Sequence, residues 1–121
     1  MARQTITIRR RHAVERDEAI EVEFPVYIRE TDDNYAGNVP YESTEAFLRI
    51  EESGRVTTAT RTREECGRRR DLTLKWEIET EIVEHADLAR HLDGPGWGVR
   101  LDATAEEFEA HLAEARAWMG I

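Results

Sequence analysis

The chain of 121 residues contains one cysteine, one lysine and two serines. The lone cysteine, Cys66, excludes an internal disulfide framework and a four-cysteine zinc site. No apolar run approaches the ~18 residues that cross a membrane, and the N-terminal residues lack the apolar stretch of a signal peptide. Neither Ser43 nor Ser53 lies in a G-x-S-x-G motif, so a serine hydrolase has no support. We therefore expect a cytoplasmic protein that does not bind membranes.

Long linkers, internal repeats and low-complexity tracts are also missing from the sequence. An apolar content of 40% is enough for a hydrophobic core, and the length is that of one compact domain. We expect residues 1–121 to form a single domain.

Acidic residues predominate, with 26 Asp and Glu against 17 Lys and Arg, which gives a net charge of −9. Two segments are nevertheless basic: residues 1–14 and residues 55–75 each carry +4. The remaining segments, 15–33, 34–54 and 76–121, carry −6, −3 and −8. Because net negative charge opposes approach to phosphates, and aromatic residues do not interleave with the bases, we expect no direct nucleic-acid binding.

Each basic segment contains an arginine triplet. If the two triplets meet at one end of the sheet, they form an anion-binding patch in an otherwise acidic protein. The residues of this candidate patch are Arg9, Arg10, Arg11, Arg68, Arg69 and Arg70.

Alternation of apolar and polar residues predicts several strands. The segments concerned are 4–10, 20–28, 55–63, 72–83 and, as a short strand, 99–101. Pro25 interrupts the second segment, which indicates a bulge or a sheet edge there. The segment 72–83 has the clearest alternation, and we predict that it is the central strand. Residues 31–40 are rich in Asp, Asn, Gly and Pro and predict a loop.

Residues 43–54 have two interpretations. Ser43 and Gly54 could bound a short capped helix, or Ser53-Gly54 could turn a hairpin into the next strand. We favour the hairpin.

Two helices are predicted near the C-terminus. The first covers residues 84–92 and the second starts at a capping box, Thr104-x-x-Glu107. The second helix carries an apolar stripe that is typical of packing on a sheet, formed by Phe108, Leu112, Ala115 and Met119. The fold class is therefore α+β: a single antiparallel sheet of about five strands, with the short helix and the C-terminal helix packed on one face.

A catalytic or metal-binding constellation is not found in the sequence. Cys66 lies among arginines that would favour its thiolate, but no histidine is linked to it by a signature. The i, i+4 pairs Asp87/His91 and Glu107/His111 lack the H-E-x-x-H pattern and are typical of surface contacts. We expect no cofactor and no bound metal, and whether the protein is an enzyme stays open, with the balance against it.

The segment 94–98 (GPGWG) lacks the strand-to-helix order of a phosphate-binding loop. Trp97 within it is either an exposed anchor for a partner or a lid folded on the core.

Acidic residues recur at the outward positions of two predicted strands: Glu21 and Glu23 on one, and Glu77, Glu79 and Glu81 on the other. Side by side these rows would repel, so a strand that carries bases should lie between or opposite them. The candidate bases are Arg9, Arg49, Arg61, Arg63 and Lys75. The acids form either a salt-bridged surface or a face that engages a basic partner.

The leading functional hypothesis is a non-enzymatic interaction module that binds a basic protein surface. Such a surface could belong to a nuclease or a nucleic-acid-handling complex, with this protein acting as an inhibitor, immunity protein or phage-type antagonist. One alternative is a small-ligand-binding protein or enzyme with a pocket between sheet and helices, with Trp76, Trp97 or His91 at its mouth. A structural subunit of a larger assembly is another, and the oligomeric state is open.

Overall fold

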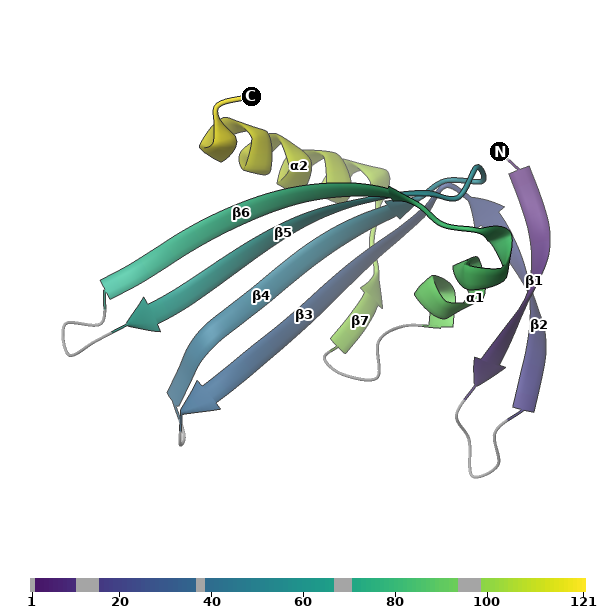
Figure 1. Cartoon of the computed structure of the whole chain (residues 1–121), viewed down its shortest axis with the longest axis horizontal. Helices are drawn as coiled ribbons and strands as arrows, with labels where there is room; N and C mark the ends of the chain where they lie inside the picture. The colour runs from purple at the N-terminus through teal and green to yellow at the C-terminus, as the bar shows by residue number, and fades with distance from the viewer. Residues whose placement is uncertain (1, 11–15, 37–38, 67–70, 94–98) are drawn as a thin grey trace.

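The computed structural model describes residues 2–10, 16–36, 39–66, 71–93 and 99–121 (Figure 1). The described chain forms seven strands and two helices. In chain order these are β1 (Ala2–Arg10), β2 (Arg16–Phe24), β3 (Val26–Ala36), β4 (Val39–Ile50), β5 (Arg55–Cys66), β6 (Asp71–Ile82), α1 (His85–Asp93), β7 (Val99–Asp102) and α2 (Ala105–Met119).

Five of the strands form one antiparallel sheet in the order β6-β5-β4-β3-β7. The remaining two, β1 and β2, pair with each other in a separate two-stranded sheet. The predicted α+β class with an antiparallel sheet is confirmed. The first two strands differ from the expectation, because they leave the main sheet and form a hairpin of their own.

Pro25 marks the point where the chain passes from the small sheet to the large one. The Phe24–Pro25 peptide bond is cis, and β2 ends at Phe24 while β3 begins at Val26. Proline has no N–H to give to a ladder, so it suits this break between two strands. The predicted single strand 20–28 is thus two strands that belong to different sheets.

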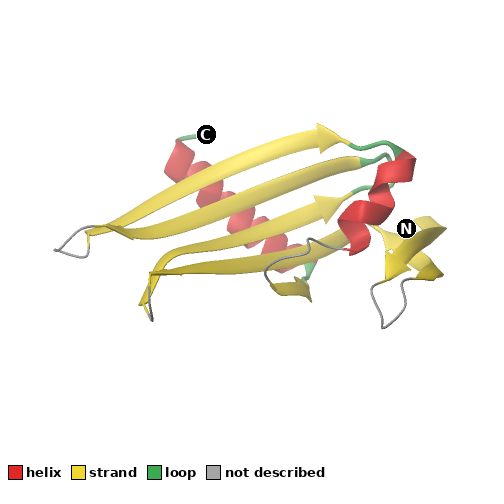
Figure 2. Cartoon of the chain, turned by 60° about the horizontal axis from the view of Figure 1, so that its bottom comes forward, coloured by secondary structure: helices red, strands yellow, loops and turns green. Residues whose placement is uncertain are grey.

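The two faces of the large sheet carry two hydrophobic cores. On one face Phe47 and Trp76 pack with Phe108 of α2. On the other face Leu48 packs with Leu88 of α1 and with Phe24 of the hairpin. We call the first the helix face and the second the open face; α1 and the hairpin cover the open face at one end alone (Figures 1 and 2).

The helices therefore lie on opposite faces of the sheet, not on one face as predicted (Figure 2). Their own boundaries agree with the predictions. The capping box of α2 is present, since the Thr104 hydroxyl accepts a hydrogen bond from the Glu107 N–H at 3.1 Å and the Glu107 carboxylate accepts one from the Thr104 N–H at 3.0 Å. The buried stripe of α2 consists of Phe108, His111, Leu112 and Ala115, while Met119 is exposed.

The hairpin interpretation of residues 43–54 is confirmed by β4 and β5. The loop predicted over 31–40 is wrong, because β3 continues to Ala36 and β4 begins at Val39. These strand ends pair Asp32 with Thr44 and Asp33 with Ser43, so their polar composition reflects shallow burial, not a loop.

The prediction that segment 72–83 is central is also wrong. This segment is β6, the edge strand of the large sheet. Alternation signals one buried face, and an edge strand has such a face as well as a central strand does. Leu74, at 38% exposed, reflects the edge position.

Candidate functional site

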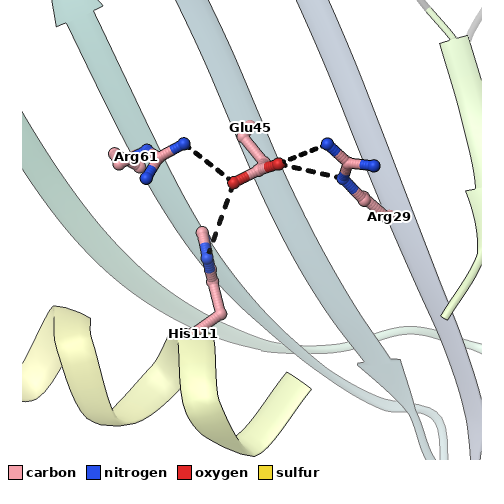
Figure 3. A network of polar contacts seen from close by, with 4 residues as sticks. All are labelled: Arg29, Glu45, Arg61 and His111. Atoms are coloured by element: carbon pink, nitrogen blue, oxygen red, sulfur yellow. Dashed lines mark hydrogen bonds and ion pairs between the residues drawn. The ribbon is translucent and has the colours of Figure 1, made fainter. Parts of the chain in front are cut away.

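A charged network lies between the helix face and α2, centred on the carboxylate of Glu45 in β4 (Figure 3). One oxygen, Oε2, accepts hydrogen bonds from Nε and Nη2 of Arg29 at 2.9 and 2.6 Å. The other, Oε1, accepts a hydrogen bond from Nη2 of Arg61 at 3.0 Å. Register places Arg61 opposite Glu45, while Arg29 is opposite the next-but-one residue, Phe47. The network thus ties three adjacent strands together on one face.

His111 is the contribution of α2 to this network. Its Nδ1 lies 3.9 Å from Oε1 of Glu45, beyond hydrogen-bond distance, and its ring packs against Phe47 and Trp76 at centroid distances of 4.5 and 4.7 Å. The side chain is 6% exposed, and Nε2 is buried without a hydrogen-bond partner. Burial lowers the pKa of His111, against the opposing attraction of Glu45 and together with the repulsion of Arg61.

A second polar contact holds the first part of α2 to the sheet. Arg49 of β4 donates to Oε1 of Glu109 at 3.3 Å, and its guanidinium lies 5.1 Å from the ring centroid of Phe108. Together with the Glu45 network, this contact fixes how α2 sits on the helix face. These groups attach α2 to the sheet. Nε2 of His111, the imidazole nitrogen without a hydrogen-bond partner, is buried and is not presented to solvent.

The residues proposed for the mouth of a pocket do not come together. Trp76 is 5% exposed beneath α2 on the helix face. His91 belongs to α1 and lies 3.5 Å from Glu81, on the other face of the sheet. Trp97 lies outside the described residues.

Of the residues considered as metal ligands, His91 lies beside Glu81, and the pair on α2 is engaged in the fold. Glu107 caps α2, and His111 points into the core under the same helix. Within the described part of the chain, no group of three or more His, Cys, Asp or Glu side chains is arranged to hold a metal ion.

The open face is strongly acidic. The irregularity in the β3–β4 pairing, between Asn34 and Tyr35, lies beyond the charged residues of interest. Directly opposite residues therefore share a face, and the pleat assigns each of these charged side chains to one face. The open face carries two described bases, Lys75 and Arg100. The described acids on it are Glu30, Asp32, Glu42, Glu64, Glu77, Glu79, Glu81 and Asp102.

The helix face has the opposite composition. By the same register it carries the bases Arg29, Arg49, Arg55, Arg61 and Arg63, and the described acids Asp33 and Glu45. Opposite charges are therefore segregated across the thickness of one sheet.

Ion pairs neutralise part of the open face. Arg100 donates from Nε and Nη2 to Oε1 of Glu30 at 3.2 and 2.6 Å, and Lys75 lies 2.8 Å from Glu77, which raises the pKa of the lysine. Elsewhere like charges meet, since Glu42 on β4 is directly opposite Glu64 on β5. Glu42 also has a polar partner on its own side, since Nδ2 of Asn34 donates to its Oε1 at 3.1 Å.

The structure separates the two acidic rows that the sequence suggested as one face. Glu21 and Glu23 lie on β2 in the small sheet, where Arg3 of β1 approaches them at 3.6 and 3.9 Å. Glu77, Glu79 and Glu81 lie on β6 in the large sheet. A strand that carries a candidate base lies opposite the first row as predicted, since β1 contains Arg9; the base that approaches Glu21 and Glu23 themselves is Arg3 of the same strand.

The candidate anion patch is only partly described. Arg9 and Arg10 end β1, whereas Arg11 and Arg68–Arg70 lie outside the described residues.

Sequence reasoning missed the acids on the other strands of the open face: Glu30, Asp32, Glu42, Glu64 and Asp102. The available signal was that Glu30 and Asp32 follow Ile28 at the two-residue spacing of one strand face, and the loop-like composition of residues 31–40 obscured it. No sequence pattern indicated the network of Glu45, Arg29 and Arg61, because a buried charged residue in a strand has the same alternating spacing as an exposed one.

No protein-family model, curated protein or solved structure matches the chain. Neither helix in the described ranges has the length and apolar content of a membrane span.

Proposed function

We propose that this protein is a non-catalytic interaction module that binds a basic protein surface through its open face. The observation that carries the proposal is the segregation of charge, with eight acids and two bases among the described side chains of that face. A partner with lysines and arginines would be attracted to this face and would relieve its internal repulsion. The basic surface of a nuclease or a nucleic-acid-handling complex is the partner class we favour, with this protein as its inhibitor.

A second support is the packing under α2. Buried side chains from the sheet and the helix fill this layer, which is one of the two places for a pocket between sheet and helices: Phe47, Ala59, Trp76, Phe108, Leu112 and Ala115. The open face, by contrast, presents half-buried or exposed polar side chains beyond the hairpin and α1. Recognition at that surface suits a macromolecular partner better than a small molecule.

The test is charge reversal at matched positions. The double variant Glu77→Lys/Glu79→Lys changes the open face, and Glu106→Lys/Glu114→Lys makes the same change in net charge on exposed positions of α2. Binding to a panel of basic nucleases is measured by calorimetry at low and physiological salt, together with inhibition of nuclease activity.

We expect binding by the wild type that weakens with salt, a loss of about tenfold or more in the open-face variant, and little change in the α2 variant. Equal affinity in both variants, or no binding to any panel member at low salt, would contradict the proposal.

A further inference from the structure

The outer edge of β6 offers backbone groups with which another strand could pair. Among the described strands, β6 pairs with β5 alone, and its twelve residues run the full length of the sheet edge. An edge of this kind presents backbone N–H and C=O groups that a further chain can pair with.

The direction of these groups follows from one hydrogen bond. The Val83 N–H donates to the Gly54 carbonyl at 2.8 Å, one register step beyond the Ile82–Arg55 pair. In an antiparallel ladder, residues whose backbone groups face the neighbour alternate with residues whose groups face away. Residues 75, 77, 79 and 81 therefore bond to β5, while the backbone groups of residues 74, 76, 78 and 80 point outward.

The side chains along this edge form two distinct rows. On the helix face Leu74 and Ile82 are 38% and 70% exposed. On the open face Glu77, Glu79 and Glu81 are exposed. A strand added to this edge would meet apolar groups on one side and carboxylates on the other.

The C-terminal end of α2 extends the apolar row. The helix contacts β6, and both views place the C-terminus beyond the β6 edge of the sheet (Figures 1 and 2). Trp118, Met119 and Ile121 are exposed there. These exposed apolar residues belong to the end of α2, the helix that packs on the helix face.

We propose that an extended segment of a basic partner, in which apolar residues alternate with lysine or arginine, adds to the outer edge of β6 as a sixth strand of the large sheet. The inference rests on the proposed function and specifies how its partner binds. Main-chain hydrogen bonds to residues 74–80 hold the segment. Its apolar side chains lie toward Leu74 and Trp118, and its basic side chains lie opposite Glu77 and Glu79.

A second copy of the chain fits this edge less well. Antiparallel pairing of two β6 strands would bring together two rows that each contain three glutamates and one lysine. Like charges opposite one another are destabilising in a sheet, whereas a basic strand neutralises the row. Charge complementarity therefore selects the basic partner.

The probe is a capped eight-residue peptide that alternates lysine and valine. Three control peptides separate the contributions: a block peptide of the same composition, an alternating glutamate–valine peptide, and the alternating lysine–valine peptide N-methylated at every valine. The valines lie opposite residues 74, 76 and 78, so N-methylation removes the donors that face β6 while it preserves charge and pattern.

We expect the alternating lysine–valine peptide to bind at least about tenfold more tightly than each control, because several main-chain hydrogen bonds form only with it. Hydrogen exchange at the amides of Trp76 and Ile78 should slow when it binds.

Protein variants test the same edge from the other side. Thr80→Pro removes an outward N–H at an exposed edge position that tolerates proline, and Thr80→Ala keeps it. We expect Thr80→Pro to weaken peptide binding about tenfold and Thr80→Ala to leave it nearly unchanged. If Thr80→Pro fails to fold, the N-methylated peptide gives the same test on the wild type.

The outcomes separate the two proposals. If the block and N-methylated peptides bind as tightly as the alternating lysine–valine peptide, strand addition is overturned and the acidic face survives as the binding surface. If no cationic peptide binds, both proposals fail. If sedimentation shows a dimer that Thr80→Pro dissociates, a second copy occupies the edge and the basic partner is overturned.

Discussion

The carboxylate of Glu45 is the centre of the charged network on the helix face. It is 19% exposed and accepts three hydrogen bonds from Arg29 and Arg61, whose side chains are 37% and 31% exposed. Glu45→Gln removes the negative charge and leaves two half-buried guanidinium groups without compensation. Because solvent screens part of this loss, we expect a decrease of about 1–3 kcal/mol in the free energy of unfolding, measured by urea denaturation.

The control for Glu45 is Glu79→Gln on the open face. Glu79 is exposed, so its substitution should change the free energy of unfolding by less than about 0.5 kcal/mol. Equal effects of the two substitutions would show that the Glu45 network contributes nothing specific.

His111 makes stability depend on pH. Its pKa is lowered in the folded state, chiefly by burial, so the unfolded chain binds more protons than the native one near and below its usual pKa of about 6.5. The contribution of His111 is therefore fully present above about pH 6.5 and is lost as the pH falls through the lowered pKa. We expect the free energy of unfolding to decrease between about pH 7 and pH 5.

Two variants isolate this effect. His111→Phe places an uncharged ring between Phe47 and Trp76, and it should flatten the pH dependence between about pH 7 and pH 5. Ala113→Gln, at an exposed position of the same helix, leaves His111 in place and should keep the slope of the wild type. The explanation fails if denaturation measured across this range gives the same slope for His111→Phe as for the wild type.

Sequence reasoning at the residue scale found His111 only as a possible partner of Glu107. Helical spacing shows which residues share a side of α2, and the apolar stripe of Phe108, Leu112 and Ala115 runs next to His111. That His111 faces Glu45 depends on the β3–β4–β5 register, which the sequence of α2 does not contain. The network was therefore beyond prediction from local patterns.

At the scale of elements, the turn between β4 and β5 depends on Gly54. Its φ is +90°, and a Cβ there would lie 2.2 Å from the carbonyl oxygen of Val83, which is backbone and cannot easily move. We expect Gly54→Ala to decrease the free energy of unfolding by about 2 kcal/mol or more, measured by thermal or urea denaturation.

Gly120 provides a matched control for Gly54. Its φ is +77°, and a Cβ there would meet no atom within 4 Å. Gly120→Ala should cost about 1 kcal/mol, the cost of the left-handed conformation alone. The difference between the two variants measures the contact with Val83; equal costs would show that the β4–β5 turn adjusts to a side chain.

The elements themselves were largely predictable where the signal was local. The capping box of α2 and the Ser53-Gly54 turn depend on neighbouring residues, and both predictions are confirmed. The loop predicted at the ends of β3 and β4 was wrong because residues 31–34 are polar for lack of a covering layer. Composition cannot distinguish an uncovered strand from a loop. The prediction that β6 is central failed because alternation of apolar and polar residues shows how many faces of a strand are buried, and not how many strands pair with it.

At the scale of the whole molecule, Pro25 divides the sheets and so decides which acids share a face. The sequence shows a strand interrupted by proline, which fits a bulge as well as a change of sheet. Because β2 moves into the hairpin, Glu21 and Glu23 leave the acidic face, while Glu30 and Asp32 join it from β3. Of the five acids expected on one face, Glu77, Glu79 and Glu81 thus lie on the open face, and Glu21 and Glu23 do not.

Because acids are concentrated on the open face, we expect salt to stabilise the folded protein. Raising NaCl from about 10 to about 150 mM shortens the screening length from roughly 30 to roughly 8 Å, which weakens repulsion between neighbouring acids such as Glu77 and Glu79 on β6. We expect the melting temperature to rise by a few degrees over this range, as calorimetry would measure.

Neutral variants locate the source of this repulsion. Glu77→Gln/Glu79→Gln should raise the melting temperature at about 10 mM NaCl and have little effect at about 150 mM, because salt then screens the same charges. Glu106→Gln/Glu114→Gln removes as much charge from α2, and Glu106 lies in the first helical turn, where a carboxylate is stabilising. That control should not raise the melting temperature. Equal increases in both variants would assign the repulsion to the net charge of −9 and not to the open face, and would remove the electrostatic reason for placing a basic partner there.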